Sequence, residues 1–304
     1  MSPAWSIDFA AFLREREDRS ERTLAAYCGA LRIFAAWFEA AYGRPFAPAE
    51  LTARDVRAYR HELQEVRGLA ASTINVALAA LRALARWAMA SGALTSNPAA
   101  SVAFVEPPPA EPRWMTRGEL SRLLAEYERA IHDAAARGAQ ERQSQATRDL
   151  AAVALMAGAG LRVSEACALD LSDVQLGERS GQAMVRFGKG RRQRRVPLSA
   201  EVRQALDSWI QLRGDADGPL LLAQRGGRLG PRQVERVFEE RARRARLEGY
   251  TPHSLRHTFV KRVVEASDLA TAKELAGHRQ IRTTARYAAP SKQELAAAAE
   301  GVLL

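Results

Sequence analysis

The chain has little cysteine and no long uninterrupted apolar run. Its 304 residues include only Cys28 and Cys167, which stand far apart and outside any metal-ligand spacing. We therefore expect neither a disulfide framework nor a cysteine-based zinc site. The longest uncharged apolar stretch, Leu150–Leu161, is shorter than the roughly 18 residues that a membrane span needs. With no secretory apolar region at the N-terminus, these features predict a cytoplasmic protein without a membrane partner.

Lysine is almost as scarce as cysteine. Only four of the 45 basic residues are lysines, and 35 acidic residues leave a net charge of +10. An arginine-rich composition can reflect coding bias alone, but the charge is unevenly distributed. Residues 1–110 carry 12 basic and 11 acidic residues, whereas residues 111–304 carry 33 and 24. The second part of the chain therefore favours a polyanionic partner such as nucleic acid.

Prolines gather at one place, between two segments that have the apolar periodicity of helices. The stretch from Asn97 to Arg113 contains five of the 13 prolines, which exclude a continuous helix and favour an extended linker. The length of the chain suggests about two domains. We expect a helical domain over residues 1–97, a linker over 98–113 and a second domain over 114–304.

The first domain is predicted to be all-α. Ser20 is a plausible N-cap for an apolar stripe that ends at Gly43, and Ser72 is another for a stripe that ends at Gly92. Shorter helices fit Ile7–Glu17 and Arg54–Arg67.

The second domain is predicted to be mainly α with a small antiparallel β-sheet. Thr116 caps a helix that runs to about Arg137, and a buried helix covers Arg148–Gly158. A glycine-flanked turn at 188–190 joins two strands as a β-hairpin, with strands expected at Ala183–Phe187 and Arg194–Leu198. Further helices are expected at Ala200–Leu212, Pro231–Leu247, Pro252–Ala266, Leu269–Ala276 and Lys292–Gly301.

The segment GLRVSEA places Arg162 and Glu165 three residues apart. On a helix these two side chains share a face, so the carboxylate could orient the guanidinium. The preceding Gly158-Ala159-Gly160 follows a helix rather than a strand and lacks a third glycine, which argues against a dinucleotide-binding loop.

The hairpin between residues 186 and 195 is densely basic, with six of its ten residues arginine or lysine. A charge run is usually a solvated face, but one this dense on a turn suits contact with phosphates. Lys189 is the only lysine before residue 261, and an ammonium group can act as a general acid whereas a guanidinium cannot. The predicted DNA contacts are Arg186, Arg191, Arg192, Arg194, Arg195 and, on a later helix, Arg232 and Arg236.

The segment TPHSLRH reads as the start of a helix. Thr251 can cap it and Pro252 suits its first position, which places His253 and Arg256 in the first turn, where the helix dipole favours an anion. His253 and His257 could instead be a metal pair. No third ligand lies nearby in the sequence, so a metal is not favoured, and His257 is interpreted as structural.

The last motifs are LAGH, which ends at His278, and TTARY, which ends at Tyr287. A lone tyrosine is most often a packing residue. Together with Arg162 in GLRVSEA, Lys189 in GKG and the HSLRH segment, however, these motifs resemble the tyrosine recombinases of the phage-integrase and Xer superfamily. Five motifs match in order and spacing over about residues 160–290, and the helical N-terminal part is similar to the core-binding domain of that family.

The resemblance implies a role for each matching residue. Tyr287 would attack a DNA phosphate and form a 3′-phosphotyrosine, and Arg162 and Arg256 would bind the non-bridging oxygens. Lys189 would protonate the leaving 5′-oxygen, and His253 would handle the proton of the nucleophile or bond the phosphate. His278 would bond a phosphate oxygen, and Glu165 would support the site.

The same resemblance implies the partners. We expect double-stranded DNA with specific core sites, and a homo-tetramer that exchanges a C-terminal helix within 292–304, with or without a second related recombinase. A protein with these partners would be associated with the nucleoid. No metal, nucleotide or other cofactor is expected, since the phosphotyrosine link stores the phosphodiester energy. Two alternatives stay open: a catalytically silent architectural DNA-binding protein, and a type IB topoisomerase-like enzyme.

Overall fold

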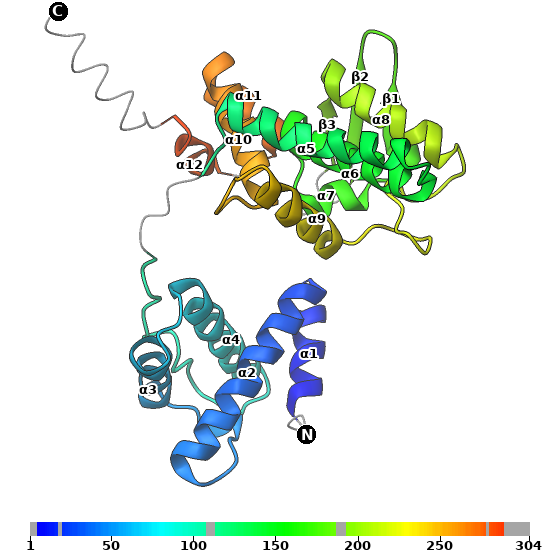
Figure 1. The fold of residues 1–304 in the computed structure, drawn as a ribbon. Helices are drawn as coiled ribbons and strands as arrows, with labels where there is room; N and C mark the ends of the chain where they lie inside the picture. Colours follow the sequence, from blue (N-terminus) through cyan, green and yellow to red (C-terminus); the bar gives the residue numbers. More distant parts are fainter. Residues whose placement is uncertain (1–4, 18–19, 108–112, 187–192, 278–279, 289–304) are drawn as a thin grey trace, which may run out of the picture. The chain divides into compact units, whose positions relative to one another are not determined.

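The computed structural model describes residues 5–17, 20–107, 113–186, 193–277 and 280–288, and it divides into two compact units at Ala110/Glu111 (Figure 1). The described residues of the first unit form helices only. These are α1 (Trp5–Glu15), α2 (Glu21–Tyr42), η1 (Pro48–Glu50), α3 (Ala53–His61), the π-helical turn η2 (Glu62–Val66) and α4 (Ala71–Ala90).

Helix α2 begins and ends where the sequence predicts. The Ser20 hydroxyl accepts a hydrogen bond from the Thr23 N–H, and Gly43 ends the helix with a φ of 69°, a conformation that glycine adopts without steric strain. Helix α4 starts one residue before the predicted cap, because the carbonyl of Ala70 already accepts hydrogen bonds from the Thr73 and Ile74 N–H groups.

The core of the first unit is rich in aromatic rings. Phe34 of α2 lies at its centre, with ring centroids 4.9 Å from Phe46 and 5.0 Å from Tyr59, both edge-on. Among the described helices, α2 alone has the length and apolar composition of a membrane span. It buries Leu24, Phe34 and other apolar side chains in this core, so the helix has a packing role inside the unit.

The described part of the second unit is mainly helical, with one small sheet. Its helices are α5 (Arg117–Ala136), α6 (Gln140–Gly158), α7 (Val163–Ala168), η3 (Leu171–Asp173), α8 (Ala200–Arg213), α9 (Pro231–Arg244), α10 (Pro252–Ala266), α11 (Leu269–Ala276) and α12 (Ile281–Ala285). Helix α6 is central and packs against α5, α8 and α10. Its small residues Ala151 and Ala152 are fully buried and let these neighbours approach closely.

The polar stretch at 131–147 is helical at both ends. It comprises the last turns of α5, a short turn at Gly138 and the first turns of α6, which starts eight residues before the predicted helix. Although this stretch is polar in composition, Ala134, Ala146 and Thr147 are buried in it.

The sheet is antiparallel, with the strand order β1 (Val174–Leu176), β2 (Gly181–Val185) and β3 (Arg194–Pro197). The predicted hairpin corresponds to β2 and β3, in the register Met184 opposite Arg195. Strand β1 is an addition, since three residues are too few to produce a recognisable alternation. The hairpin tip at 187–192, with Lys189, Arg191 and Arg192, lies outside the described residues, as does the helix predicted at Lys292–Gly301.

The chain enters the second unit along helix α10. The Met115 N–H donates a hydrogen bond of 2.8 Å to the Thr258 hydroxyl, and the Lys261 ammonium lies 5.2 Å from the centroid of the Trp114 ring. Arg113 donates to the carbonyl of Gly249, just before α10. These contacts fix the chain before α5 begins at its Thr116 cap.

Candidate active site

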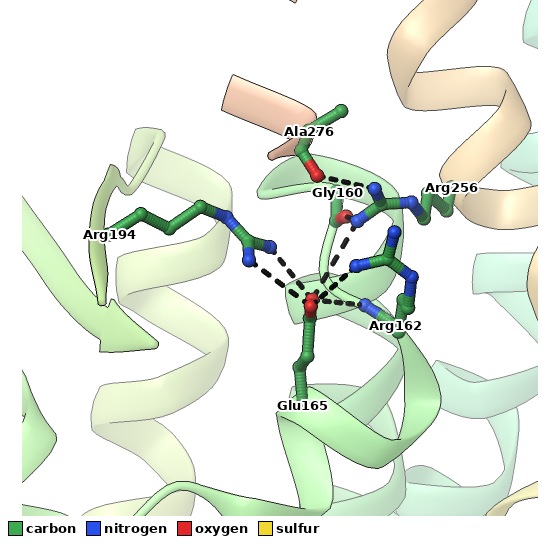
Figure 2. A network of polar contacts seen from close by, with 6 residues as sticks. All are labelled: Gly160, Arg162, Glu165, Arg194, Arg256 and Ala276. Carbon is green, nitrogen blue, oxygen red and sulfur yellow. Dashed lines mark hydrogen bonds and ion pairs between the residues drawn. The ribbon is translucent and has the colours of Figure 1, made fainter. Parts of the chain in front are cut away.

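The centre of the site is the carboxylate of Glu165, which is 5% exposed. Arg162 is the N-cap residue of α7 and donates to it twice, from its backbone N–H (3.0 Å to Oε2) and from Nη1 (2.7 Å to Oε1). Arg194, at the start of β3, donates twice more, from Nη1 (3.1 Å to Oε1) and Nη2 (2.7 Å to Oε2). The predicted pairing of Arg162 with Glu165 is therefore formed, and a second arginine joins it (Figure 2).

Arg256 completes what we call the Glu165 network. Its side chain comes from the first turns of α10, and one nitrogen lies 3.7 Å from Oε2 of Glu165. The same guanidinium donates to two main-chain carbonyls, that of Gly160 before α7 and that of Ala276 at the end of α11. Arg256 is 2% exposed and thus cross-links three segments of the chain (Figure 2).

The charges of the network perturb one another strongly. Burial alone would raise the pKa of Glu165, but the hydrogen bonds and charges of Arg194 and Arg162 outweigh it and lower that pKa to about 2. Burial and the neighbouring charge of Arg162 lower the pKa of Arg256 to about 10. At neutral pH three guanidinium cations therefore share one carboxylate, and the network carries an excess of positive charge.

The three guanidinium groups differ in how accessible they are. The side chain of Arg162 is 35% exposed, that of Arg194 is 13% exposed and that of Arg256 is 2% exposed. Arg162 thus offers the most open donor of the network to an anion arriving from solvent, while Glu165 holds its guanidinium in place.

Tyr287, the residue just beyond α12 and its C-cap, packs beside this network. It is 3% exposed and belongs to a small apolar cluster with Val260 of α10 and Ala272 and Ala276 of α11, which we call the tyrosine cluster. The hydroxyl of Tyr287 is hydrogen-bonded to Nδ1 of His257. Burial raises the pKa of Tyr287, and the charges of Arg256 and Arg286 act to lower it. The tyrosine is therefore within electrostatic reach of the Glu165 network.

The rings of the two histidines of α10, His253 and His257, pack against each other one turn apart. Their ring centroids are 4.3 Å apart in an edge-on arrangement, with His253 exposed and His257 half-buried. Although much of the His253 side chain faces solvent, the atoms packed around its ring partly desolvate it, and this desolvation, followed by the charges of Arg256 and Arg162, lowers the pKa of His253. His253 is thus held largely neutral near the arginines, whereas His257 is the residue that contacts Tyr287.

Helix α10 presents these groups together because of how it starts. Thr251 precedes it in extended conformation and donates its N–H to the Ser254 hydroxyl at 3.1 Å, and Pro252 occupies the first helical position, as predicted. Leu255 is fully buried on the core side.

The structure brings together five of the seven predicted catalytic residues: Arg162, Glu165, His253, Arg256 and Tyr287. Lys189 and His278 lie outside the described residues. Gly277, the residue before His278, has a φ of 63°, and the side chain of Arg194 lies 3.0 Å from where a Cβ would be.

The predicted DNA contacts fall into three groups. Arg195, Arg232 and Arg236 are exposed, and Arg186 is exposed but paired with Asp173. Arg191 and Arg192 are outside the described residues. Arg194 was predicted to contact DNA from the hairpin, but its guanidinium turns inward and pairs with the buried Glu165.

The contact of His257 with Tyr287 was not predicted from the sequence. The position of His257 one helical turn after His253 was the available signal.

Comparison with known proteins identifies the family. The Phage integrase family model matches residues 113–294, and the model of the phage integrase N-terminal SAM-like domain matches residues 8–91. Tyrosine recombinase XerC of Escherichia coli O157:H7 is 33% identical over 235 residues, which cover 76% of this chain and 74% of the relative. XerC of Corynebacterium efficiens is 30% identical over 293 residues, covering 95% and 87%.

Solved structures share the fold at lower identity. XerH site-specific recombinase bound to a palindromic difH substrate matches with a TM-score of 0.73 and 19% identity, covering 97% of this chain and 84% of that one. Lambda integrase (75–356), solved as a dimer bound to a COC′ core site, matches with a TM-score of 0.71 and 18% identity, covering 97% and 98%. The chain therefore belongs to the phage integrase family and is a tyrosine recombinase, an enzyme of site-specific DNA recombination.

Proposed function

We propose that this recombinase cuts DNA by attack of Tyr287 on a backbone phosphate, with the Glu165 network as the phosphate-binding site. The observation that carries the proposal is the convergence of Arg162 and Arg256 on Glu165, with Tyr287 close enough for the charge of Arg256 to act on its pKa. The excess positive charge of the network suits the anionic oxygens of a phosphate, whose charge increases in the transition state.

Each residue then has a role in the reaction. Arg162 and Arg256 bind the non-bridging oxygens, and Glu165 keeps both guanidinium groups in place. The Tyr287 oxygen forms a bond to phosphorus, and the bond from phosphorus to the 5′-oxygen breaks. Lys189, from the hairpin, gives its proton to that oxygen, and His278 donates a hydrogen bond to the phosphate. Re-ligation runs the same steps backwards and needs no nucleotide.

The direct test uses a nicked duplex from the protein's own locus, incubated with the full chain in EDTA. We expect a covalent protein–DNA adduct that survives denaturing electrophoresis and that Tyr287→Phe does not form. The phenylalanine variant keeps the ring in the tyrosine cluster and removes only the hydroxyl. A metal-dependent cut without an adduct would contradict the proposal, and DNA binding without any cleavage would favour an architectural role.

We infer that the active assembly is a tetramer on two core sites, formed by this chain alone or together with a related recombinase. It acts in the cytoplasm on chromosomal or mobile-element DNA. An apolar groove of about 1040 Å³ lies between α5, α6, α8 and α10. Leu124, Leu150, Val202 and Phe259 are among its lining residues. The C-terminal stretch 292–304 ends in an alanine- and leucine-rich sequence of suitable character, and we propose that each protomer inserts it into this groove of its neighbour.

A groove variant tests this assembly. Leu212 lines the groove and is 51% exposed, so Leu212→Glu should leave the fold intact. We expect this variant, and a chain ending at Ser291, to bind one core site normally but to lose the two-site complex in a gel-shift assay. Leu69→Glu, at a comparably exposed leucine of the first unit, is the control. A two-site complex of normal stability in Leu212→Glu would contradict the proposal.

A further inference from the structure

The hydroxyl of Tyr287 is hydrogen-bonded to Nδ1 of His257, not only packed against it. The centroids of the two rings are 5.4 Å apart and the ring planes are tilted by 39°. In this arrangement Nδ1 of the imidazole points at the phenol hydroxyl. His257 comes from the middle of α10, directly after Arg256, and Tyr287 comes from beyond α12. The contact therefore joins the helix that carries the phosphate-binding arginine to the nucleophile.

Attack by a tyrosine requires that its proton leave. A neutral phenol is a weak nucleophile, and burial in the tyrosine cluster raises the pKa of Tyr287 further. Ionisation before the attack is therefore costly, and a base that takes the proton during the attack lowers the barrier. Such a base must lie within hydrogen-bonding reach of the hydroxyl, and the structure gives this position to His257.

We propose that His257 is a further catalytic residue, and that its Nδ1 accepts the phenolic proton as the Tyr287 oxygen attacks the DNA phosphate. This inference rests on the proposed function. The O–H bond of Tyr287 breaks as the proton bonds to Nδ1, the freed electron pair forms the oxygen–phosphorus bond, and the phosphorus–5′-oxygen bond breaks as Lys189 supplies a proton. On re-ligation the attacking 5′-hydroxyl gives its proton back to Lys189 and His257 returns its proton to the departing tyrosine oxygen, so the enzyme ends unchanged.

The proposal changes the role expected for His253. His253 is exposed and lies one turn earlier on α10. Its ring contacts the ring of His257, with 4.3 Å between the centroids, and it is His257 that is hydrogen-bonded to Tyr287. The exposed position of His253 beside Arg162, the most open arginine of the network, is suited to a hydrogen bond with the phosphate rather than to the proton of the tyrosine.

The experiment measures single-turnover cleavage of the nicked duplex by the full chain and its variants. We expect His257→Ala to bind DNA as tightly as the wild type and to cleave roughly 100-fold more slowly, the usual loss when a general base is removed. Added imidazole should restore cleavage at least tenfold in His257→Ala and have no effect on His253→Ala. Restoration of His253→Ala alone, or cleavage by His257→Ala within threefold of the wild type, would overturn the proposal.

A second variant separates proton transfer from mere positioning. In His257→Asn the amide can still hydrogen-bond the tyrosine hydroxyl, but it cannot take its proton. Slow cleavage by this variant supports the catalytic role, whereas a wild-type rate would show that His257 only positions Tyr287 and would overturn it. The wild type and Tyr287→Phe run alongside: if the wild type itself forms no adduct, the proposed function fails, whatever the result at His257.

Discussion

The carboxylate of Glu165 and the guanidinium of Arg194, which are 29 positions apart in the sequence, form a bidentate ion pair with nitrogen–oxygen distances of 3.1 and 2.7 Å. The pair ties strand β3 to helix α7, and Lys189 precedes β3 in the sequence, outside the described residues. Two segments with catalytic roles in our proposal are thus joined by a side chain that the sequence presents as one of many surface arginines.

This arrangement gives Glu165 a role in stability beside the role that we propose for it in catalysis. Replacing it by glutamine keeps the shape but leaves Arg162, Arg194 and the buried Arg256 without a counter-charge. We expect Glu165→Gln to lower the free energy of unfolding by about 3 kcal/mol or more, as measured by urea denaturation of the full chain. Glu240→Gln is the control, because its partner Arg244 is 50% exposed and surface pairs contribute at most about 1 kcal/mol. Equal effects in the two variants would contradict the prediction.

The same carboxylate predicts a dependence of stability on pH. Its pKa falls from an ordinary value near 4.5 to about 2 on folding, so its contribution is complete above pH 4.5 and is lost as the pH falls toward 2. The difference in stability between wild type and Glu165→Gln should therefore be largest near neutral pH and shrink in acid. Urea midpoints of both proteins at about pH 6 and about pH 3 measure it. A difference that grows in acid would refute the assignment.

Gly160 tests the close packing behind Arg256. Its φ is +66°, and a Cβ there would lie 2.3 Å from the ring of Phe259, so Gly160→Ala meets both backbone strain and a steric clash. We expect it to lower stability by roughly 2–4 kcal/mol and to slow cleavage, because the Gly160 carbonyl holds Arg256. Gly118→Ala in α5, where a Cβ meets open space, should be neutral or slightly stabilising. Thermal melts and the adduct assay compare the two variants.

Lys189 can be tested through its leaving group. We expect Lys189→Ala to impair cleavage of an ordinary phosphodiester and to recover on a DNA whose 5′-leaving group is sulfur, since a thiolate leaves without protonation. The measurement is the ratio of the cleavage rate on the sulfur-containing DNA to that on the ordinary DNA, compared between the wild type and the variant. An equal defect on both DNAs would remove Lys189 from the role of general acid.

Much of the fold could be predicted from the sequence because its helices carry strong local signals. Ser20, Gly43, Thr116 and Pro252 act as caps or first residues in the structure as their residue types predict. Predictions were weaker where tertiary packing decides: α6 extends through a polar stretch because Ala146 and Thr147 are buried, and β1 is too short to have a periodicity.

The candidate site divides in the same way. Arg162 and Glu165 are neighbours in sequence, so their contact could be predicted from helix geometry. Arg194 and His257 could not be assigned, because each depends on a partner from a distant segment, Glu165 and Tyr287 respectively. Between residues 186 and 195, nothing in the local sequence distinguishes Arg194, which turns inward, from Arg186 and Arg195, which are exposed.

The contacts of Arg113, Trp114 and Met115 with α10 or the loop before it show that the packing of the second unit begins before its first helix. Judged by secondary structure, it begins with the cap at Thr116, yet the three preceding residues contact α10 or the loop before it, and Trp114 packs against the tyrosine cluster. A fragment cut at the cap would contain the five motifs and still lack Trp114, which packs beside Tyr287, the nucleophile in our proposal. We therefore expect that a fragment of the second unit keeps the packing around Tyr287 only if it starts no later than Arg113.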